Sequence, residues 1–358
     1  MPIKDTAGHI PAVSILMPAY NVSRYVRQAI DSVLAQTRPD FELLVVDDGS
    51  TDDTAEIVAG YAGREPRIRL IRQPNQGIGA ARNTALAAAR APWVALLDSD
   101  DVWLPGYLEA QLAILERRPE IDVLSANAVN MGGVWDGLVY NPRIRGDDPI
   151  ELTLPDLVEH EDAVCILSMI RRHMLEALGG FNAQLRGSED YDLWLRGLVH
   201  GYRIFFNPVP LGGYRRRPDS VSRDELRMLD AIVVPLRLVR AHQGTDAAVC
   251  RAIDDKLARY ATRREIVLAR QALAQGETAS FVERLQTLHR QTGQVRYRVG
   301  AALCRLSPRV FGWLFSCRSV LRRLRMAAGT GHEHVRYEGP EMAQMSVTIT
   351  RRRLDRVP

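Results

Sequence analysis

A short apolar run, Val94–Leu97, is followed at once by three carboxylates within four residues, Asp98, Asp100 and Asp101. Side chains two positions apart at a strand end point to the same side, so Asp98 and Asp100 can act together. A hard divalent cation takes oxygen ligands and keeps several waters, which suits one or two such carboxylates. The stretch therefore predicts a metal site at Asp98 and Asp100, and we expect Asp101 to cap the next helix. The alternative is a solvated loop whose aspartates only cap that helix.

A second pair of acids, Glu189 and Asp190, stands at the start of a helical pattern, Arg186–Gly201. We expect Ser188 to cap this helix, so that its first turn holds a carboxylate in a fixed position. Such a carboxylate can accept a proton from a hydroxyl group within hydrogen-bond reach. The alternative is an acid that only complements the dipole of the helix.

The segment Gly77–Asn83, GIGAARN, has two closely spaced glycines and an arginine. A dinucleotide-binding fingerprint would need a third glycine where Arg82 stands, and it would follow the first strand. The segment instead offers a flexible entrance to a helix with an arginine in its opening turn. Such a site suits contact with phosphate or ribose, and an exposed helix arginine is the alternative.

The elements that must position these residues alternate along the first part of the chain. Apolar runs predict strands over 13–20, 41–50, 68–73, 93–101 and 121–129, and helical spacing predicts helices over 26–34, 51–63, 79–90 and 104–119. Thr51 or Asp52 can cap the second helix. Continuous apolar strands separated by helices indicate an α/β fold with a mostly parallel sheet. Ligands of such sheets bind beyond the carboxyl ends of the strands, where the polar segments Pro18–Asn21, Asp47–Ser50 and Asp98–Asp101 stand.

Charge divides the 358-residue chain into two parts. Residues 1–224 contain 23 basic and 31 acidic residues, whereas residues 225–358 contain 24 and 12. This asymmetry predicts two parts with different partners. We expect these parts to be a catalytic domain over 1–224 and a mainly helical, basic C-terminal region over 225–358. Helical spacing over 225–300 indicates a small helical bundle.

Within the basic region, residues 305–326 pair an apolar stretch that includes Phe311, Trp313 and Phe315 with a following cluster of arginines. A basic amphipathic helix with aromatic residues can lie in the interface of an anionic membrane. A helix docked on the catalytic domain is the alternative, and both stay open.

Three further features concern the compartment. The N-terminus has no basic region followed by an apolar run, so we expect no signal peptide. No window approaches the roughly 18 apolar residues of a spanning helix. The four cysteines lack metal-ligand spacing and are expected to be reduced thiols. We expect a cytoplasmic protein, or one held peripherally at the cytoplasmic face of the inner membrane.

Six segments, in this order, resemble the family 2 glycosyltransferases of the GT-A fold: VSILMPAYN, VVDDGSTDDT, NQGIGAARN, LLDSDD, GGFN and SEDYDLWLR. The resemblance covers about residues 12–222 and leaves the basic region uncovered. It implies the GT-A fold for this part of the chain, and the spacing described above adds a helical C-terminal extension. It also implies an inverting transferase that takes a sugar from a nucleoside diphosphate, usually UDP, using Mg or Mn.

The same resemblance implies roles on the donor side. Asp100 would contact the metal directly, and Asp98 would contact the ribose or a metal-bound water. Asp48 would accept a hydrogen bond from uracil N3–H, and Tyr20 would stack on the base. Its other donor-side positions are Pro18, Asp47, Arg82 and Ser99.

For the chemical step, the resemblance places the base on Asp190, with Glu189 as the second choice. Related sequences often have a histidine where this chain has Arg217. An arginine cannot ligate a metal but can pair with phosphate, so we expect Arg215 and Arg217 near the diphosphate. The acceptor-side positions are Gly180, Phe181 and Trp194, of which Trp194 also suits the core.

These observations together predict transfer of a single sugar to a saccharide or lipid-linked acceptor in cell-surface polysaccharide biosynthesis. A nucleotidyltransferase of sugar phosphates is one alternative, but its glycine- and lysine-rich first loop is missing from Val13–Asn21. An inactive saccharide-binding protein is another, and the intact acidic set argues against it. A processive membrane synthase would need spanning helices and a QxxRW motif, which QVRYR at Gln294 is not. No nucleic-acid partner is expected, because no recognised binding module is present.

Overall fold

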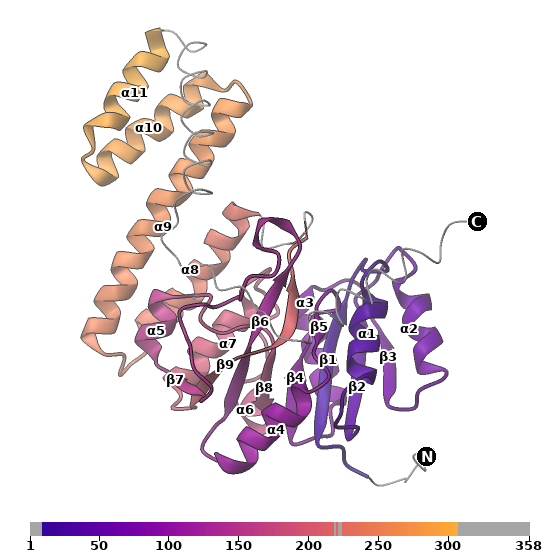
Figure 1. The fold of residues 1–358 in the computed structure, drawn as a ribbon. Coiled ribbons are helices and arrows are strands. Elements are labelled where there is room, and N and C mark those ends of the chain that lie inside the picture. Colours follow the sequence, from indigo (N-terminus) through magenta and orange to yellow (C-terminus); the bar gives the residue numbers. More distant parts are fainter. Residues whose placement is uncertain (1–8, 218–219, 221–223, 307–358) are drawn as a thin grey trace. The chain divides into compact units, whose positions relative to one another are not determined.

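The computed structural model describes residues 9–217, 220 and 224–306, which form two compact units that divide after Ser220. The first unit contains one nine-stranded mixed sheet with helices, and the described part of the second contains helices alone (Figure 1). That the first unit holds the whole catalytic domain stays a prediction.

One half of the sheet is parallel and has the strand order β3-β2-β1-β4. All residues of β1 and β2 are buried, which explains why these strands are continuous apolar runs in the sequence. The pairing of Ala19 with Asp47 and of Leu16 with Leu96 brings the carboxyl ends of β1, β2 and β4 to one edge. The bounds are β1 Val13–Ala19, β2 Phe41–Asp47, β3 Ile68–Arg72 and β4 Trp93–Leu96.

The other half of the sheet is mixed and continues β4 in the order β8-β6-β9-β5, with β7 also paired to β9. β8 is antiparallel to both β4 and β6, so β6 runs in the direction of β4, and β9 is parallel to β6. The carboxyl ends of β6 and β9 therefore lie at the same edge as those of β1, β2 and β4. The bounds are β5 Val102–Trp103, β6 Val123–Met131, β7 Ile150–Leu152, β8 Ser168–Arg171 and β9 Ile204–Arg215.

The helices of the first unit connect and cover these strands (Figure 1). In α1 the buried residues are Val26, Ala29, Ile30 and Val33, the spacing of one helical face. The bounds are α1 Val26–Leu34, α2 Thr54–Ala62, α3 Ile78–Ala88, α4 Tyr107–Arg117, α5 Leu154–Glu159, α6 Arg172–Ala177 and α7 Glu189–Val199, with a 3₁₀ turn at Gly133–Trp135.

The cap expected for α2 is wrong in position, because Asp53 occupies the N-cap and makes no side-chain cap hydrogen bond. The predicted capping residue Asp52 instead accepts from the backbone N–H of Thr54 at 3.0 Å and from that of Ser23 at 3.1 Å. The carboxylate of Asp52 therefore ties the start of α2 to the segment that precedes α1.

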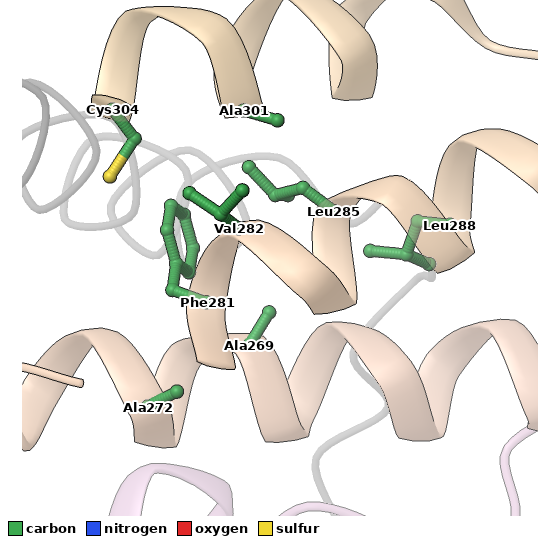
Figure 2. Packing of buried hydrophobic residues seen from close by; sticks show 8 residues of the cluster. All are labelled: Ala269, Ala272, Phe281, Val282, Leu285, Leu288, Ala301 and Cys304. Carbon is green, nitrogen blue, oxygen red and sulfur yellow. The ribbon is translucent and has the colours of Figure 1, made fainter. Parts of the chain in front are cut away.

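The second unit confirms the helical prediction over its described residues, 225–306. Its helices α9, α10 and α11 share a small apolar core that contains Phe281, Leu285 and Cys304 (Figure 2). The bounds are α8 Glu225–Ala241, α9 Ala247–Ala274, α10 Thr278–Thr292 and α11 Val295–Leu306.

Within the ranges given above, no helix is both long and apolar enough to cross a lipid bilayer. The predicted membrane-binding segment 305–326 lies outside the described residues except for its first two positions.

Candidate active site

Asp98 and Asp100 converge after β4 as the sequence predicts, and Asp101 joins them. Asp98, Asp100 and Asp101 each place one carboxylate oxygen within 4.8 Å of the others. A tight turn, in which the N–H of Asp101 donates to the carbonyl of Asp98 at 3.0 Å, brings them together. Burial and the charge of Asp98 raise the pKa of Asp100 to about 6, although Arg217 opposes the shift. Three crowded carboxylates of this kind are a favourable site for a hard divalent cation.

Asp101 belongs to this cluster, and its expected role as a helix cap is wrong. Helix α4 begins only at Tyr107, with Gly106 at its N-cap. Asp101 is 1% exposed, and its Oδ1 accepts from the backbone N–H of Arg215 at 2.7 Å. Its Oδ2 has no hydrogen-bond partner among the described residues. A cation bound to the cluster would give this oxygen a partner, so the donor set fits Mg²⁺ or Mn²⁺.

Arg82 joins the two acidic groups that the sequence places far apart. Its Nη2 lies 2.7 Å from Asp98 Oδ1, and its Nη1 lies 2.5 Å from Glu189 Oε1. The side chain is 1% exposed, and burial works against its charge. The nearby carboxylates outweigh this effect and raise the pKa of Arg82, so the guanidinium stays charged. Both Nη atoms of Arg82 thus already bind carboxylates. Its predicted contact with phosphate stays a prediction.

The two acids at the start of α7 have different surroundings. Glu189 is 4% exposed, and burial raises its pKa to about 7 against the opposing charge of Arg82. Asp190 is partly exposed, and its Oδ1 accepts from the backbone N–H of Tyr191 at 2.7 Å. Burial also raises the pKa of Asp190, again against Arg82. Of these two acids, Asp190 alone combines a raised pKa with access to a substrate.

The cap expected from Ser188 is wrong. Ser188 does occupy the N-cap of α7, but its φ of 59° is left-handed and its side chain makes no cap hydrogen bond. The buried Oγ of Ser188 has no hydrogen-bond partner in the described structure. After this left-handed residue the chain enters α7 with Glu189 in contact with Arg82. The spacing of residues in the sequence does not predict this contact.

Asp48 lies directly after β2 and organises the loop before α3. It is 3% exposed, and its Oδ1 accepts from Gln73 Nε2 at 2.7 Å and from the N–H of Gln76 at 2.9 Å. Its Oδ2 accepts from the N–H of Gly77 at 2.8 Å. The carboxylate that is predicted to bind uracil therefore already accepts three hydrogen bonds from the chain.

The remaining donor-side positions differ in exposure. Tyr20, directly after β1, is 48% exposed at the edge of the sheet. Pro18 is buried inside β1, opposite Val46 of β2. Asp47 and Ser99 are 5% and 4% exposed, and Asp47 Oδ1 accepts from the N–H of Ser50 at 3.3 Å. Of these four positions, Tyr20 alone presents a large surface to a ligand.

Arg215 and Arg217 both face Asp100. Arg215 Nε donates to the carbonyl of Asp100 at 2.6 Å, and its Nη2 donates to Gln28 at 2.8 Å. Arg217 Nε lies 2.7 Å from Asp100 Oδ2, an ion pair without the alignment of a hydrogen bond. Both arginines thus stand next to the cluster where a diphosphate is expected.

The acceptor-side positions surround Asn83, which sequence reasoning missed although it adjoins Arg82. Asn83 Nδ2 donates to the carbonyl of Phe181, and its Oδ1 accepts from the N–H of Phe181, both at 2.8 Å. Gly180 has a φ of +75° and packs against the same side chain. Phe181 and Trp194 are 2% and 1% exposed, so both are core residues and not open acceptor surface.

Comparison with known sequences supports these motifs. The profile described as glycosyl transferase family 2 matches residues 14–179. TuaG of Bacillus subtilis, named as a teichuronic acid biosynthesis glycosyltransferase, is 31% identical over 218 residues, 60% of this chain and 83% of TuaG. Chondroitin synthase of Escherichia coli is 34% identical over 195 residues, but these are 53% of this chain and only 27% of the synthase.

Two solved structures are similar in fold. Staphylococcus aureus TarS 1–349 in complex with UDP-GlcNAc has a TM-score of 0.58 at 20% identity, covering 80% of this chain and 82% of that chain. The mannosyltransferase PcManGT from Pyrobaculum calidifontis, in complex with GDP-Man and Mn²⁺, has a TM-score of 0.53 at 19% identity, covering 84% and 88%. These similarities confirm the GT-A fold with its helical C-terminal region. With the sequence match that spans most of TuaG, they show that the chain belongs to glycosyl transferase family 2.

Proposed function

We propose that the protein is an inverting glycosyltransferase that moves one sugar from a nucleoside diphosphate, UDP in the first place, to a saccharide or lipid-linked acceptor. The observation that carries this proposal is the buried Arg82, which holds Asp98 and Glu189 in one site. Through Asp98, Arg82 binds the acidic group that we expect to face the donor. Through Glu189, it binds the start of α7, the helix that presents the expected base. The catalytic domain is residues 1–224, and the product belongs to cell-surface polysaccharide biosynthesis.

In the transfer step, the acceptor hydroxyl oxygen attacks the anomeric carbon from the side opposite the diphosphate. The new glycosidic C–O bond forms as the bond to the diphosphate breaks, and the nucleoside diphosphate leaves with the electron pair. Asp190 takes the proton of the hydroxyl, a role that its raised pKa and partial exposure suit. Glu189 stays paired with Arg82 and fixes the start of α7.

On the donor side, Tyr20 stacks on the base, Asp48 accepts from its N3–H, and Arg215 and Arg217 pair with the diphosphate. Asp98, Asp100 and Asp101 would hold Mg²⁺ or Mn²⁺, which when bound offsets negative charge on the departing diphosphate. Arg217 contributes a fixed positive charge beside the same oxygens.

The names of similar proteins support this substrate class. TarS was solved with UDP-GlcNAc and PcManGT with GDP-Man and Mn²⁺. TuaG is named for teichuronic acid biosynthesis, and the Escherichia coli relative is named chondroitin synthase. UDP and GDP are therefore the two nucleotides to compare first.

A thermal-shift screen of UDP- and GDP-sugars, each with Mn²⁺ and with a chelator, tests the proposal. A ligand that binds only the folded state raises the melting temperature, so a UDP-sugar should do so and should do so more with Mn²⁺. Inorganic phosphate with Mn²⁺ is the control and should give little change. If no nucleotide sugar shifts the melting temperature under either condition, the proposed function is wrong. Release of pyrophosphate from UTP and a sugar 1-phosphate would instead favour the nucleotidyltransferase.

A further inference from the structure

Three consecutive arginines follow Tyr214 at the end of β9, and they do not face the same way. Arg215 and Arg217 contact Asp100, as described above. Successive side chains of an extended strand alternate between its two faces, so Arg216 shares its face with Tyr214. Arg216 is therefore directed away from the diphosphate position that its neighbours serve.

The guanidinium of Arg216 is held in place by three neutral side chains. Its Nε donates to Asn130 Oδ1 at 2.8 Å. Its Cζ lies 4.6 Å from the ring centroid of Tyr214 and 5.6 Å from that of Tyr140, distances at which a cation is attracted to a ring face. The two rings also pack edge to face, with centroids 5.2 Å apart. Backbone pairing with Met131 fixes the residue further, because the N–H of Arg216 donates to the Met131 carbonyl at 3.0 Å.

Arg216 is nevertheless exposed and has no counter-ion among the described residues. Some exposed arginines of the chain are paired with acids, as Arg203 is with Glu151 at 2.7 Å and Arg264 with Asp230 at 2.8 Å, whereas the contacts that hold Arg216 come from neutral side chains. Since Nε is bound to Asn130, the two Nη nitrogens remain for a ligand. A rigid, unpaired guanidinium fork is suited to bind a carboxylate or phosphate through both nitrogens.

The position of Arg216 relates it to the proposed active site. It follows β9, whose carboxyl end lies at the edge of the sheet where the donor-side acids gather. The backbone N–H of the preceding Arg215 donates to Asp101 Oδ1 at 2.7 Å, so Arg216 directly follows a residue that is bound to the acidic cluster of Asp98, Asp100 and Asp101. Asp98 is in turn bound to Arg82, which holds the start of α7. Arg216 thus lies at the edge of the sheet that carries the proposed active site.

The loop of residues 132–135 adds exposed apolar surface beside Arg216. Gly132 and Gly133 approach Arg216 closely enough that a Cβ on Gly132 would meet its carbonyl at 3.6 Å. The next residues, Val134 and Trp135, are 89% and 45% exposed. Exposed aromatic and apolar groups beside a fixed cation are the usual components of a site for an anionic organic ligand.

We propose that Arg216 is a specificity-determining residue that binds an anionic group, a carboxylate or a phosphate, carried by the acceptor saccharide. The inference rests on the proposed function, because it assumes that a saccharide acceptor approaches Asp190. It adds a substrate class, since neutral glycans lack the group that Arg216 binds.

Direct binding of three oligosaccharides to the full chain tests this inference. The first ends in a uronic acid, the second is the same molecule with its carboxyl group reduced to an alcohol, and the third carries a phosphate. Calorimetry should show that the wild type binds one of the two anionic oligosaccharides roughly tenfold more tightly than the reduced one. The anionic oligosaccharide that binds more tightly shows whether Arg216 binds a carboxylate or a phosphate.

Two variants separate binding by Arg216 from a merely structural role. Arg216→Gln should abolish the preference for the anionic oligosaccharide and leave affinity for the reduced one unchanged. Arg203→Gln, which alters an exposed arginine already paired with Glu151, should retain the preference. The inference is overturned if the wild type binds all three oligosaccharides equally or binds none, or if Arg216→Gln keeps the preference.

Melting temperatures of the same samples with UDP- and GDP-sugars, with and without Mn²⁺, separate this inference from the proposed function. A chain that responds to a nucleotide sugar but shows no charge preference retains the proposed function and loses the role of Arg216. A charge preference lost in Arg216→Gln without any response to nucleotide sugars would keep the anion site and contradict sugar transfer.

Discussion

Two adjacent carboxylates at the start of α7 illustrate how one site divides its tasks between residues. Glu189 is buried and lies 2.5 Å from Arg82, so its charge is used to hold Arg82 in place. Asp190 is partly exposed and bonds only a neighbouring backbone N–H among the described partners. A proton acceptor must be reachable by the substrate, and therefore we assign the base to Asp190 and a positioning role to Glu189.

We expect Asp190→Asn to lower kcat by roughly 10²- to 10⁴-fold, because the amide cannot accept the proton of the acceptor hydroxyl. Binding of the donor should persist, since its phosphates and base contact other residues. Steady-state kinetics with the donor identified by the thermal-shift screen provide the measurement. Asp192→Asn is an unsuitable comparison because Asp192 is buried and pairs with Arg196, so Asp162, whose ion pair with Arg143 lies at the surface, is the control position. Near-normal turnover of Asp190→Asn would place the base elsewhere.

The raised pKa of Asp190 predicts how the rate depends on pH. Burial raises this pKa above its ordinary value of 3.8, although Arg82 works in the opposite direction. The base must be ionised to accept a proton, so kcat/KM should fall as the pH is lowered through the raised pKa. The acidic limb should therefore lie above the ordinary range of an aspartate when kcat/KM is followed from pH 4 to 9 at saturating Mn²⁺. A kcat/KM that shows no fall down to pH 4 would contradict this assignment.

Asp100→Asn should remove the Mn²⁺-dependent part of donor binding, because an amide is a much weaker ligand than a carboxylate for a hard cation. The rise in melting temperature that a UDP-sugar causes with Mn²⁺ should drop to the value measured with a chelator. Asp162→Asn changes an exposed acid that pairs with Arg143, and it should keep the full Mn²⁺ effect. An unchanged Mn²⁺ effect in Asp100→Asn would exclude its role as a ligand.

At the scale of elements, the sequence predicts what is continuous along the chain. The buried strands β1 and β2 are uninterrupted apolar runs, and Asp98 and Asp100 are close in sequence, so both were identified. Strand β9 was missed because Pro208, Pro210 and two glycines interrupt it, residues that strands usually avoid. The contact between Arg82 and Glu189 spans 107 residues and depends on how the sheet folds.

Failed cap predictions have a related cause. A cap requires a particular backbone geometry as well as a suitable side chain. Ser188 has the right chemistry, but its left-handed backbone prevents the bond, and Asp101 lies too far before α4. Tertiary contacts determine these backbone conformations, and no local pattern in the sequence predicts them.

The turn between α6 and α7 offers a matched pair of glycine substitutions. Gly179 and Gly180 have φ values of +72° and +75°, so alanine at either position adds strain of about 1–2 kcal/mol. A Cβ at Gly180 would also meet Asn83 Oδ1 at 2.5 Å, whereas one at Gly179 meets nothing within 4 Å. Gly180→Ala should therefore lower the free energy of unfolding by about 1–3 kcal/mol more than Gly179→Ala, measured by urea denaturation. Equal losses would show that Asn83 does not restrain this turn.

For the molecule as a whole, the difference in charge between residues 1–224 and 225–358 indicates that the two regions have different partners. Residues 1–224 are net acidic and contain the proposed site, whereas residues 225–358 contain twice as many basic as acidic residues. Six of these basic residues are arginines within 305–326, next to aromatic residues. We propose that this segment binds the anionic surface of a membrane, where lipid-linked acceptors are found.

The full chain should therefore sediment with vesicles that contain anionic lipid and stay in solution with neutral vesicles. Each arginine near an anionic surface adds about 1 kcal/mol of attraction, so removing several should release the protein. Replacing Arg318, Arg322, Arg323 and Arg325 by glutamine is the variant, and replacing four arginines of α9, Arg251, Arg259, Arg263 and Arg270, is the matched control. Binding should weaken in the first variant only and should fall as salt is raised, because salt screens the attraction. If the wild type ignores anionic vesicles even at low salt, the basic segment has another partner, and a helix packed on the catalytic domain becomes the better account of it.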